Sequence, residues 1–486
     1  MDMKLFQRTR ARQLLREMEQ AESYQDWVEL AQAYDHECGL DDWKQDDACE
    51  SYDFRAIRRR LDILRDLRFR RDYPQLLFTL NEGVHGNLGG MGKPSLYNKA
   101  KLGTKQLICR YLDELCGALR DLDQVDDKII PLAEKQDFFL RASHCNGRSA
   151  LMLSGGAVLG FFHAGVLRAL FEQGLLPEII SGSSAGSILA ATACTHTDEE
   201  LHERLSLDNL HHEVEETRAI RPVLSLLGSG RPNMDAENLI AYLGKIIPDL
   251  TFQEAFELTG RKLNITVTGL EPRQAPRLLN AITSPNVLIR SAVQASCAIY
   301  GIYPPVTLMC RNAKGETVPY LPGEKWIDGS FADDLPAKRL ARLYGVNHFI
   351  SSMTNPAALA ITPDPDVPRN LLRSLVNYQA RWWKMGSAEM LRFSREHIRI
   401  KSPVLNLMQH LTYGVLAQDY TADINIFLRN RWDHPLRLLA PPSREAMHRL
   451  IHEGERSTWE RVEMVRNCTA VSRTLDEILH RRGWES

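Results

Sequence analysis

The amino-acid sequence predicts an α/β protein with a mainly parallel sheet, flanked by helical regions at both ends of the chain. Short apolar runs alternate with helical stretches only in the middle of the chain. The segments on either side show the apolar spacing of helices. The 486 residues also exceed one ordinary domain of roughly 100–200 residues. We therefore expect a helical domain at 1–145, an α/β core at 147–356 and a mainly helical region at 357–486.

The composition is that of a globular protein, with 44% hydrophobic and 25% charged residues. The 60 Lys and Arg residues nearly balance the 62 Asp and Glu residues, which argues against a nucleic-acid partner. The nine cysteines have no regular spacing, so they predict neither a disulfide framework nor a zinc site, and they fit a reducing compartment. The N-terminal residues lack the apolar core of a signal peptide. We therefore expect a cytoplasmic protein.

The first region carries apolar residues at helical spacing. The residues at i, i+4 and i+7 are Trp27, Ala31 and Tyr34 in one helix and Ile57, Leu61 and Leu64 in the next. The second of these helices is rich in arginine between residues 55 and 71. Two interpretations stay open for it: a solvated face paired with Asp53, Asp62, Asp66 and Asp72, or a contact with an anionic lipid surface.

The middle of the chain contains short apolar runs that predict strands. These runs are residues 151–153, 178–180, 263–267, 278–282, 325–327 and 347–351, with a further candidate at 423–427. Because helical stretches separate them, a largely parallel sheet is expected. Three uncharged stretches, at 149–167, 179–197 and 291–310, approach the ~20 residues of a membrane span. Their glycines, prolines and small polar residues favour buried segments of an α/β core instead.

A sharp turn is predicted around Ser184. The sequence GSSAG at 182–186 directly follows the strand at 178–180 and precedes a helix-prone stretch. Glycines on both sides allow a tight turn that exposes the serine hydroxyl at the edge of the sheet, as in a nucleophile elbow. We therefore predict Ser184 as a nucleophile, with Gly182 and Gly186 as the glycines of the elbow.

A second glycine-containing loop, SGGAVLG at 154–160, follows the strand at 151–153 and opens a helix. Glycines leave backbone N–H groups unobstructed near a reacting carbonyl, as an oxyanion hole requires. A dinucleotide-binding loop fits less well, because Gly155 and Gly156 are adjacent rather than alternating.

The base that would activate the serine has several candidates. Asp328 follows the strand at 325–327 and precedes Gly329, so its carboxylate could accept the serine proton or could merely cap a turn. His348 at a strand start and His163 after the glycine loop are the competing bases.

The two loops and the Asp-Gly-Ser turn, in this order and spacing, resemble the patatin-like phospholipase family. Members of that family use a Ser–Asp dyad. The resemblance implies a patatin-like three-layer α/β/α core, with Ser184 as the nucleophile and Asp328 as the base. The oxyanion-loop residues that it implies are Gly155, Gly156, Ala157 and Gly160.

Other segments are similar to intracellular triacylglycerol lipases that carry a helical N-terminal domain. These segments are residues 86–97, 103–105, 326–330, 334–336, 346–350, 418–420, 423–424 and 458–460. The resemblance therefore covers most of the chain. Ser154 and Leu159 depart from it, since patatins typically carry an acidic and a basic residue there. Without the basic residue, a neutral acylglycerol is favoured over an anionic phospholipid.

The resemblance implies ester hydrolysis of triacylglycerol through an acyl-enzyme, with neither metal nor cofactor. A phospholipase A or lysophospholipid acyltransferase on the same dyad is one alternative, and a non-enzymatic lipid-surface scaffold is another. Substrate in lipid aggregates implies peripheral contact with a membrane or lipid body. Trp382, Trp383 and Lys384 are predicted either to form an interfacial element or to pack a helix against the core.

Overall fold

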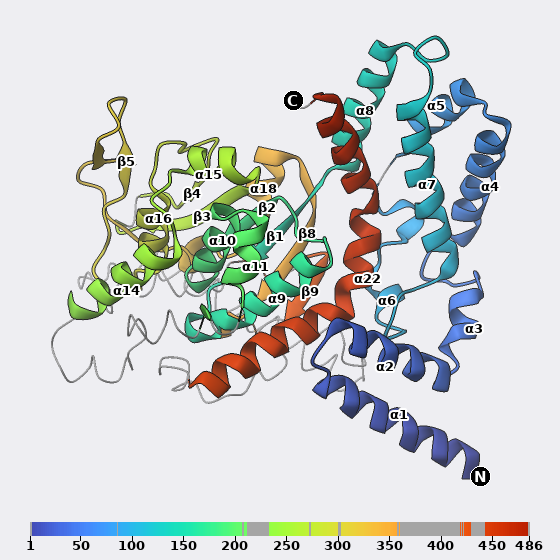
Figure 1. Ribbon diagram of the computed structural model, residues 1–486, viewed down its shortest axis with the longest axis horizontal. Helices are drawn as coiled ribbons and strands as arrows, with labels where there is room; N and C mark the ends of the chain where they lie inside the picture. The colour runs from blue at the N-terminus through green and yellow to red at the C-terminus, as the bar shows by residue number, and fades with distance from the viewer. Residues whose placement is uncertain are drawn as a thin grey trace, which may run out of the picture.

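The computed structural model describes residues 2–84, 86–206, 209–210, 233–271, 274–299, 303–356, 359, 418, 420, 422–428 and 443–484. Figure 1 shows the N-terminal helices on one side, the sheet on the other, and the long C-terminal helix α22 running between them. No helix within these ranges is both long and apolar enough to cross a bilayer. The predicted interfacial residues Trp382, Trp383 and Lys384 lie outside the described residues.

The N-terminal region is helical, as its apolar spacing predicts. Its helices are α1 (Asp2–Gln20), α2 (Tyr24–Glu37), α3 (Leu40–Gln45), α4 (Phe54–Arg70), α5 (Tyr73–Asn81), η1 (Leu88–Gly90), α6 (Pro94–Tyr97), α7 (Gln106–Gln124) and α8 (Leu132–Asn146). The i, i+4, i+7 residues Ile57, Leu61 and Leu64 of α4 are buried, and so are Trp27 and Ala31 of α2. The periodicity therefore identified the packed faces correctly.

The main sheet has seven strands in the order β4-β3-β2-β1-β8-β9, with β7 paired to β3. They are β1 (Arg148–Leu153), β2 (Ile179–Gly182), β3 (Lys262–Gly269), β4 (Arg277–Leu279), β7 (Trp326–Asp328), β8 (Val346–Met353) and β9 (Ile424–Phe427). β3, β2, β1, β8 and β9 are parallel, whereas β4 and β7 run antiparallel to β3. The α/β class and the mainly parallel sheet are confirmed.

Two features of the strands differ from the sequence prediction. The strand predicted at 278–282 ends at Leu279, because the Asn280 side chain accepts the N–H groups of Ile282 and Thr283 and turns the chain. A small second sheet, β5 (Met309–Arg311) with β6 (Thr317–Pro319), was not predicted.

The core helices follow the strands, as expected of βα units. They are η2 (Ala157–Gly160), α9 (Phe161–Glu172), α10 (Ala185–Thr195), α11 (Asp198–Arg204), α14 (Asn233–Ile246), α15 (Phe252–Thr259), α16 (Ile289–Ser296), α17 (Ser330–Asp333) and α18 (Ala337–Tyr344). The three uncharged stretches overlap the core helices α9, α10 and α16, respectively. Their described parts are therefore segments of the α/β core rather than membrane spans.

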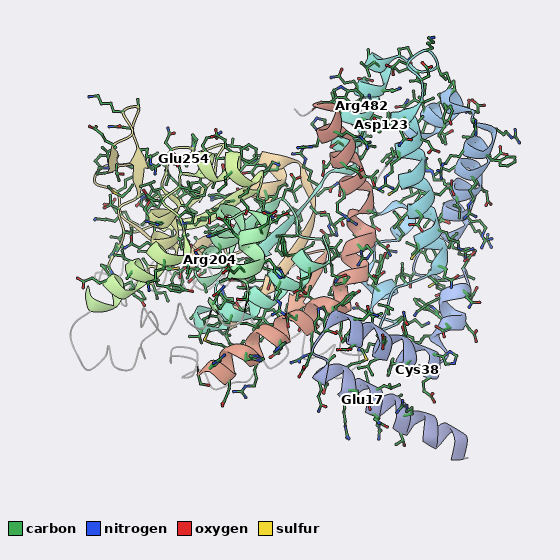
Figure 2. The ribbon with its side chains drawn as sticks, in the orientation of Figure 1. Glu17, Cys38, Asp123, Arg204, Glu254 and Arg482 are labelled. Carbon is green, nitrogen blue, oxygen red and sulfur yellow. The ribbon has the colours of Figure 1, made fainter. Side chains whose placement is uncertain are left out.

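The C-terminal helix α22 (Arg444–Arg482) joins the two parts of the molecule. It packs backbone to backbone on α9, since a Cβ at Gly165 would overlap the Ile451 carbonyl oxygen and one at Gly454 would overlap that of Phe162. At its other end, Arg482 Nε lies 2.7 Å from an oxygen of the buried Asp123 on α7 (Figure 2). The helix α22 thus contacts both the α/β core, through α9, and the N-terminal helices, through α7.

Candidate active site

Ser184 occupies a strained turn between β2 and α10. Its φ of 50° lies in the left-handed region that non-glycine residues rarely adopt. A Cβ at Gly182 would overlap the Gly186 carbonyl oxygen, and a Cβ at Gly186 would overlap that of Leu153. Only glycine fits on both sides of the serine, which is the arrangement expected of a nucleophile elbow.

The C-terminal end of α16 and the residues that follow it hold this strained turn in place. The Ser184 N–H donates to Ser296 Oγ over 3.0 Å. The Ser184 carbonyl oxygen accepts from Ser187 Oγ at 2.6 Å and from Cys297 Sγ at 3.4 Å. Strain at a functional residue persists only when its surroundings fix it, and these three bonds do so. Ser296 and Cys297 belong to the third uncharged stretch, whose sequence gave no sign of this role.

Asp328 ends β7, which pairs antiparallel with β3 so that Asp328 lies opposite Val267. The same segment that holds Ser184 also holds this residue, because the Asp328 N–H donates to the Ala298 carbonyl at 3.0 Å. The β7 strand therefore brings the predicted base to the end of the sheet where the elbow lies, although the two residues are far apart in sequence.

The Asp328 carboxyl is 2% exposed, and this burial raises its pKa to about 6. The Ser330 N–H, which donates to the carboxylate at 2.8 Å, opposes the rise, and the nearby hydroxyls of Ser184 and Ser330 act in the same direction. The Ser184 hydroxyl therefore lies close enough to the Asp328 carboxylate to lower its pKa. A carboxylate with this pKa is ionised at neutral pH and is a stronger base than an exposed aspartate.

The glycine loop lies directly against the elbow. A Cβ on Gly155 would sit 3.4 Å from Ser184 Cβ and 2.9 Å from Ser330 Cβ. A Cβ on Gly160 would sit 2.7 Å from Ala185 Cβ, at the start of α10. Side chains at these two positions would therefore push the loop away from the serine. This agrees with the expectation that glycines keep the loop unobstructed near the reacting carbonyl.

The four predicted oxyanion residues differ in what their N–H groups do. The Gly155 N–H donates to Asp334 Oδ1 at 2.8 Å, so a buried carboxylate already occupies it. The Gly160 N–H belongs to the 3-10 turn η2. Among the described residues, no protein acceptor takes the N–H of Gly156 or Ala157, and both residues are half-exposed. Those two groups are open to a ligand.

The competing histidines are engaged elsewhere. His163 is fully buried, with Nε2 2.9 Å from the Ser154 carbonyl oxygen and Nδ1 2.6 Å from Ser352 Oγ. Burial lowers its pKa to about 4, so the ring is neutral and ties the glycine loop to β8. His348 pairs in register with Ser149 at the start of β1, whereas the elbow follows the carboxyl end of β2. Four residues of strand separate these levels, roughly 13 Å.

Asp334 is a site residue to which the sequence assigned no role. It is 1% exposed, and besides the Gly155 N–H it accepts Asn355 Nδ2 at 2.8 Å. Burial raises its pKa to about 7, with the nearby charge of Asp328 adding to the rise. A carboxylate six residues after Asp328, immediately before Leu335-Pro336, was the signal available in the sequence.

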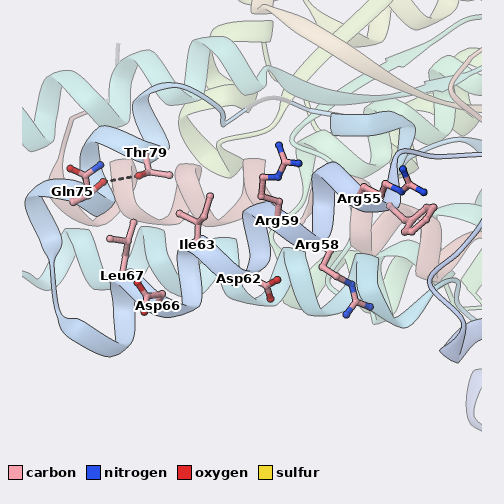
Figure 3. Close-up of a pocket in the computed structure, with 10 residues that line it drawn as sticks. Arg55, Arg58, Arg59, Asp62, Ile63, Asp66, Leu67, Gln75 and Thr79 are labelled. Carbon is pink, nitrogen blue, oxygen red and sulfur yellow. Dashed lines mark hydrogen bonds between the residues drawn. The ribbon is translucent and has the colours of Figure 1, made fainter.

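The outer face of α4 carries a shallow groove, remote in the chain from the elbow. Arg55, Arg58, Arg59, Asp62, Ile63 and Asp66 are among the residues that line it (Figure 3). Three arginines of α4 pair with acidic residues of other segments: Arg58 contacts Asp47, Arg65 contacts Glu114, and Arg68 contacts Glu114 and Asp121.

The acidic partners predicted for α4 differ from those observed. Asp66 pairs with Arg70 at 2.9 Å, but Asp53 and Asp72 instead cap the N-termini of α4 and α5 by accepting backbone N–H groups. On this helix Arg58, Arg65, Arg68 and Arg70 form ion pairs, and among the described residues Arg55, Arg59 and Arg60 form none. A solvated, paired face and a lipid contact both stay predictions. In the described ranges, no group of three or more His, Cys, Asp or Glu residues could hold a metal ion.

Comparison with known proteins identifies the family. The profile of the patatin-like phospholipase family matches residues 151–341, and that of a domain of unknown function, DUF3336, matches residues 4–144. The triacylglycerol lipase SDP1L of Arabidopsis thaliana is 31% identical over 95% of this chain and 57% of its own length. The triacylglycerol lipase ptl2 of Schizosaccharomyces pombe is 30% identical over 98% of this chain and 76% of its own.

Among solved structures, that of VipD from Legionella pneumophila is similar with a TM-score of 0.33 and 16% identity, covering 66% of this chain and 67% of that one. The chain spans little more than half the length of the Arabidopsis relative. The family profile over the β1–α18 core and the near full-length match to the fission-yeast protein agree with the elbow and the Asp-Gly-Ser turn described above. The chain belongs to the patatin-like phospholipase family, with a DUF3336 domain in front of the patatin domain.

Proposed function

We propose that the chain is a serine lipid acyl hydrolase whose substrate is triacylglycerol. The observation that carries the proposal is that the hydroxyl of Ser184, on a strained elbow, lies beside the buried carboxylate of Asp328 and affects its pKa. Relatives named as triacylglycerol lipases support the choice of substrate. In this proposal the core at 147–356 carries the chemistry, and the helical regions at 1–145 and 357–486 support it.

The first half of the reaction acylates the enzyme. Ser184 Oγ attacks the acyl carbonyl carbon while its proton passes to Asp328. The carbonyl oxygen becomes an oxyanion, which the N–H groups of Gly156 and Ala157 stabilise. When the tetrahedral intermediate collapses, the bond to the glycerol oxygen breaks, and that oxygen takes the proton from Asp328. Diacylglycerol leaves, and the fatty acyl group stays on Ser184 as an ester.

The second half returns the enzyme to its starting state. A water molecule gives a proton to Asp328 and attacks the acyl carbon, which forms a second oxyanion. Collapse breaks the bond to Ser184 Oγ, which recovers the proton from Asp328, and the fatty acid is released. Each oxyanion donor contributes about 10²–10³ to the rate in comparable hydrolases. Because Gly155 and Gly160 have no side chains, the glycine loop can pack closely against Ser184.

Two neutral residues of the loop support a neutral substrate. Ser154 Oγ accepts the Thr354 N–H at 2.8 Å, and the Leu159 side chain packs within the hydrophobic core. The loop positions at which patatins typically carry an acidic and a basic residue therefore carry no charge. Leu159 offers no positive charge to bind the phosphodiester of a phospholipid headgroup. An acylglycerol carries no charge and does not require one.

The proposed substrate forms lipid aggregates, so the enzyme must act at a lipid surface. We propose peripheral association of the chain with membranes or lipid bodies. Co-flotation of the purified protein with triacylglycerol emulsions tests this association. A protein that stays in the aqueous fraction while it hydrolyses emulsified substrate would contradict it.

The chemical proposal is tested by labelling with a fluorophosphonate and mapping the adduct by mass spectrometry. We expect the label on Ser184, and loss of both label and fatty-acid release in Ser184→Ala. Release from trioleoylglycerol emulsions is then compared with release from phosphatidylcholine vesicles. Faster release from the vesicles would instead indicate a phospholipase A on the same dyad. Activity that survives Ser184→Ala would refute the serine mechanism, and absence of any activity in the native chain would favour a lipid-surface scaffold.

A further inference from the structure

Asp334 connects three separate segments at the end of the sheet. It follows the short helix α17. Its Oδ1 accepts the Gly155 N–H from the end of β1, and its Oδ2 accepts Asn355 Nδ2 from the end of β8, both at 2.8 Å. Its own N–H donates to Gln418 Oε1 at 2.7 Å, and Gln418 Nε2 returns to the Ser330 carbonyl at 3.1 Å. One carboxylate therefore joins the glycine loop to the loop of the proposed base.

These bonds fix the direction of the peptide groups in the glycine loop. Asp334 holds the N–H of Gly155, while Thr354 Oγ1 donates to the Gly155 carbonyl oxygen at 3.1 Å. The peptide bond between Gly155 and Gly156 is trans. In a trans peptide the N–H points opposite to the C=O. The Gly156 N–H therefore points away from Thr354 and is left open.

The pattern of donors explains why a carboxylate stands at this position. Both oxygens of Asp334 receive N–H donors, one from backbone and one from the Asn355 amide. An asparagine has one acceptor oxygen in place of two, so it can accept only one of these two donors. The carboxylate is therefore matched to two donors, although it lies buried near Asp328.

We propose that Asp334 is a positioning residue that clamps the glycine loop so that the N–H groups of Gly156 and Ala157 face the acyl carbonyl. This inference rests on the proposed hydrolase function. Asp334 touches no reacting atom and acts only through the loop. Its loss should leave substrate binding intact and should weaken stabilisation of the oxyanion.

The test exchanges the two partners of the clamp. Asp334→Ala, which removes both acceptor oxygens, should lower kcat on a soluble short-chain ester by about 10²-fold, the effect of losing one oxyanion donor, with KM unchanged. The exchange variant Asp334→Asn/Asn355→Asp should keep most of the native kcat. The new amide oxygen at 334 accepts the Gly155 N–H, and its NH₂ donates to the new carboxylate at 355. Asp333→Asn is the control, because that neighbouring carboxylate pairs with Arg339 and should not affect kcat.

The outcomes separate this proposal from the function on which it rests. If Ser184→Ala keeps the esterase activity, the proposed function fails. If activity depends on Ser184 but Asp334→Ala keeps the native kcat, only the clamp fails. An equal loss in Asp333→Asn would assign the effect to charge near the site rather than to the loop. A folded exchange variant whose kcat is as low as that of Asp334→Ala also overturns the clamp.

Discussion

Replacing Asp328 by asparagine should abolish hydrolysis and yet stabilise the fold. Burial raises the pKa of this carboxyl from 3.8 to about 6 in the folded chain, so the folded state holds its ionised form less well than the unfolded state does. Each pKa unit is worth about 1.4 kcal/mol, which gives a penalty of roughly 3 kcal/mol above pH 6. The asparagine has no charge to bury, and its amide oxygen can still accept the Ser330 N–H.

The sign of the pH dependence follows from the two pKa values. Above pH 6 Asp328 is ionised in both states, and the full penalty opposes folding. Between pH 6 and 3.8 the folded state takes up its proton first, so the penalty declines as the pH falls. Below pH 3.8 both states are neutral and the penalty vanishes. The stability gain of Asp328→Asn should therefore be largest at pH 8 and close to zero near pH 4.

Denaturant unfolding of native and variant protein at pH 8, 6 and 4.5 measures this gain as a difference in unfolding free energy. Ser184→Ala is the matched control. It should also inactivate the enzyme, but it keeps the buried carboxylate and removes a hydroxyl that lowers its pKa, so no gain is expected. Two results would refute this reasoning: an Asp328→Asn variant no more stable than the native chain at pH 8, or a stability gain as large at pH 4.5 as at pH 8. Either would show that burial of the ionised Asp328 carboxylate does not destabilise the fold.

Three other expectations concern the base, the elbow and the long helix. The kcat for ester hydrolysis should fall with a midpoint near pH 6 as Asp328 becomes protonated, and a flat profile from pH 5 to 7 would rule it out as the base. Ser296→Ala should lower kcat by roughly tenfold, because the N–H of Ser184 loses its acceptor. Ser291→Ala, on the same helix, is the control and should leave kcat unchanged. Equal losses in the two variants would refute the role of Ser296. Gly165→Ala should lower the free energy of unfolding by more than about 3 kcal/mol, because its methyl group would overlap the Ile451 carbonyl oxygen of α22. A denaturant midpoint equal to that of the native chain would contradict this packing.

The local parts of the site could be predicted from sequence. Ser184 was recognisable because a strand, two glycines and a helix lie within a few residues of it. Asp328 was recognisable because a strand and a glycine flank it. The roles of both residues in catalysis remain predictions. The fold class was predictable for the same reason, since buried parallel strands leave short apolar runs that alternate with helices.

The parts that depend on long-range contact could not be predicted. Ser296 accepts the N–H of a serine 112 residues earlier, and Asp334 accepts that of a glycine 179 residues earlier. Neither residue has a local pattern that distinguishes it from an ordinary serine or aspartate. Likewise, nothing in the α4 sequence indicates that its arginines pair with Asp47, Glu114 and Asp121 rather than with acids on their own helix.

The two buried carboxylates at the end of the sheet are separated by six residues, and the groups beside them suggest different roles. The Ser184 hydroxyl lies beside Asp328, and its proton can be transferred when its oxygen attacks a carbonyl. The donors to Asp334 are a backbone N–H and an amide NH₂, which keep their protons at any pH the protein tolerates. A carboxylate beside a hydroxyl can act as a base, whereas one bonded only to amides can only hold them in place. The chemistry of the neighbouring group, rather than the raised pKa that both aspartates share, therefore distinguishes the proposed base from the proposed clamp.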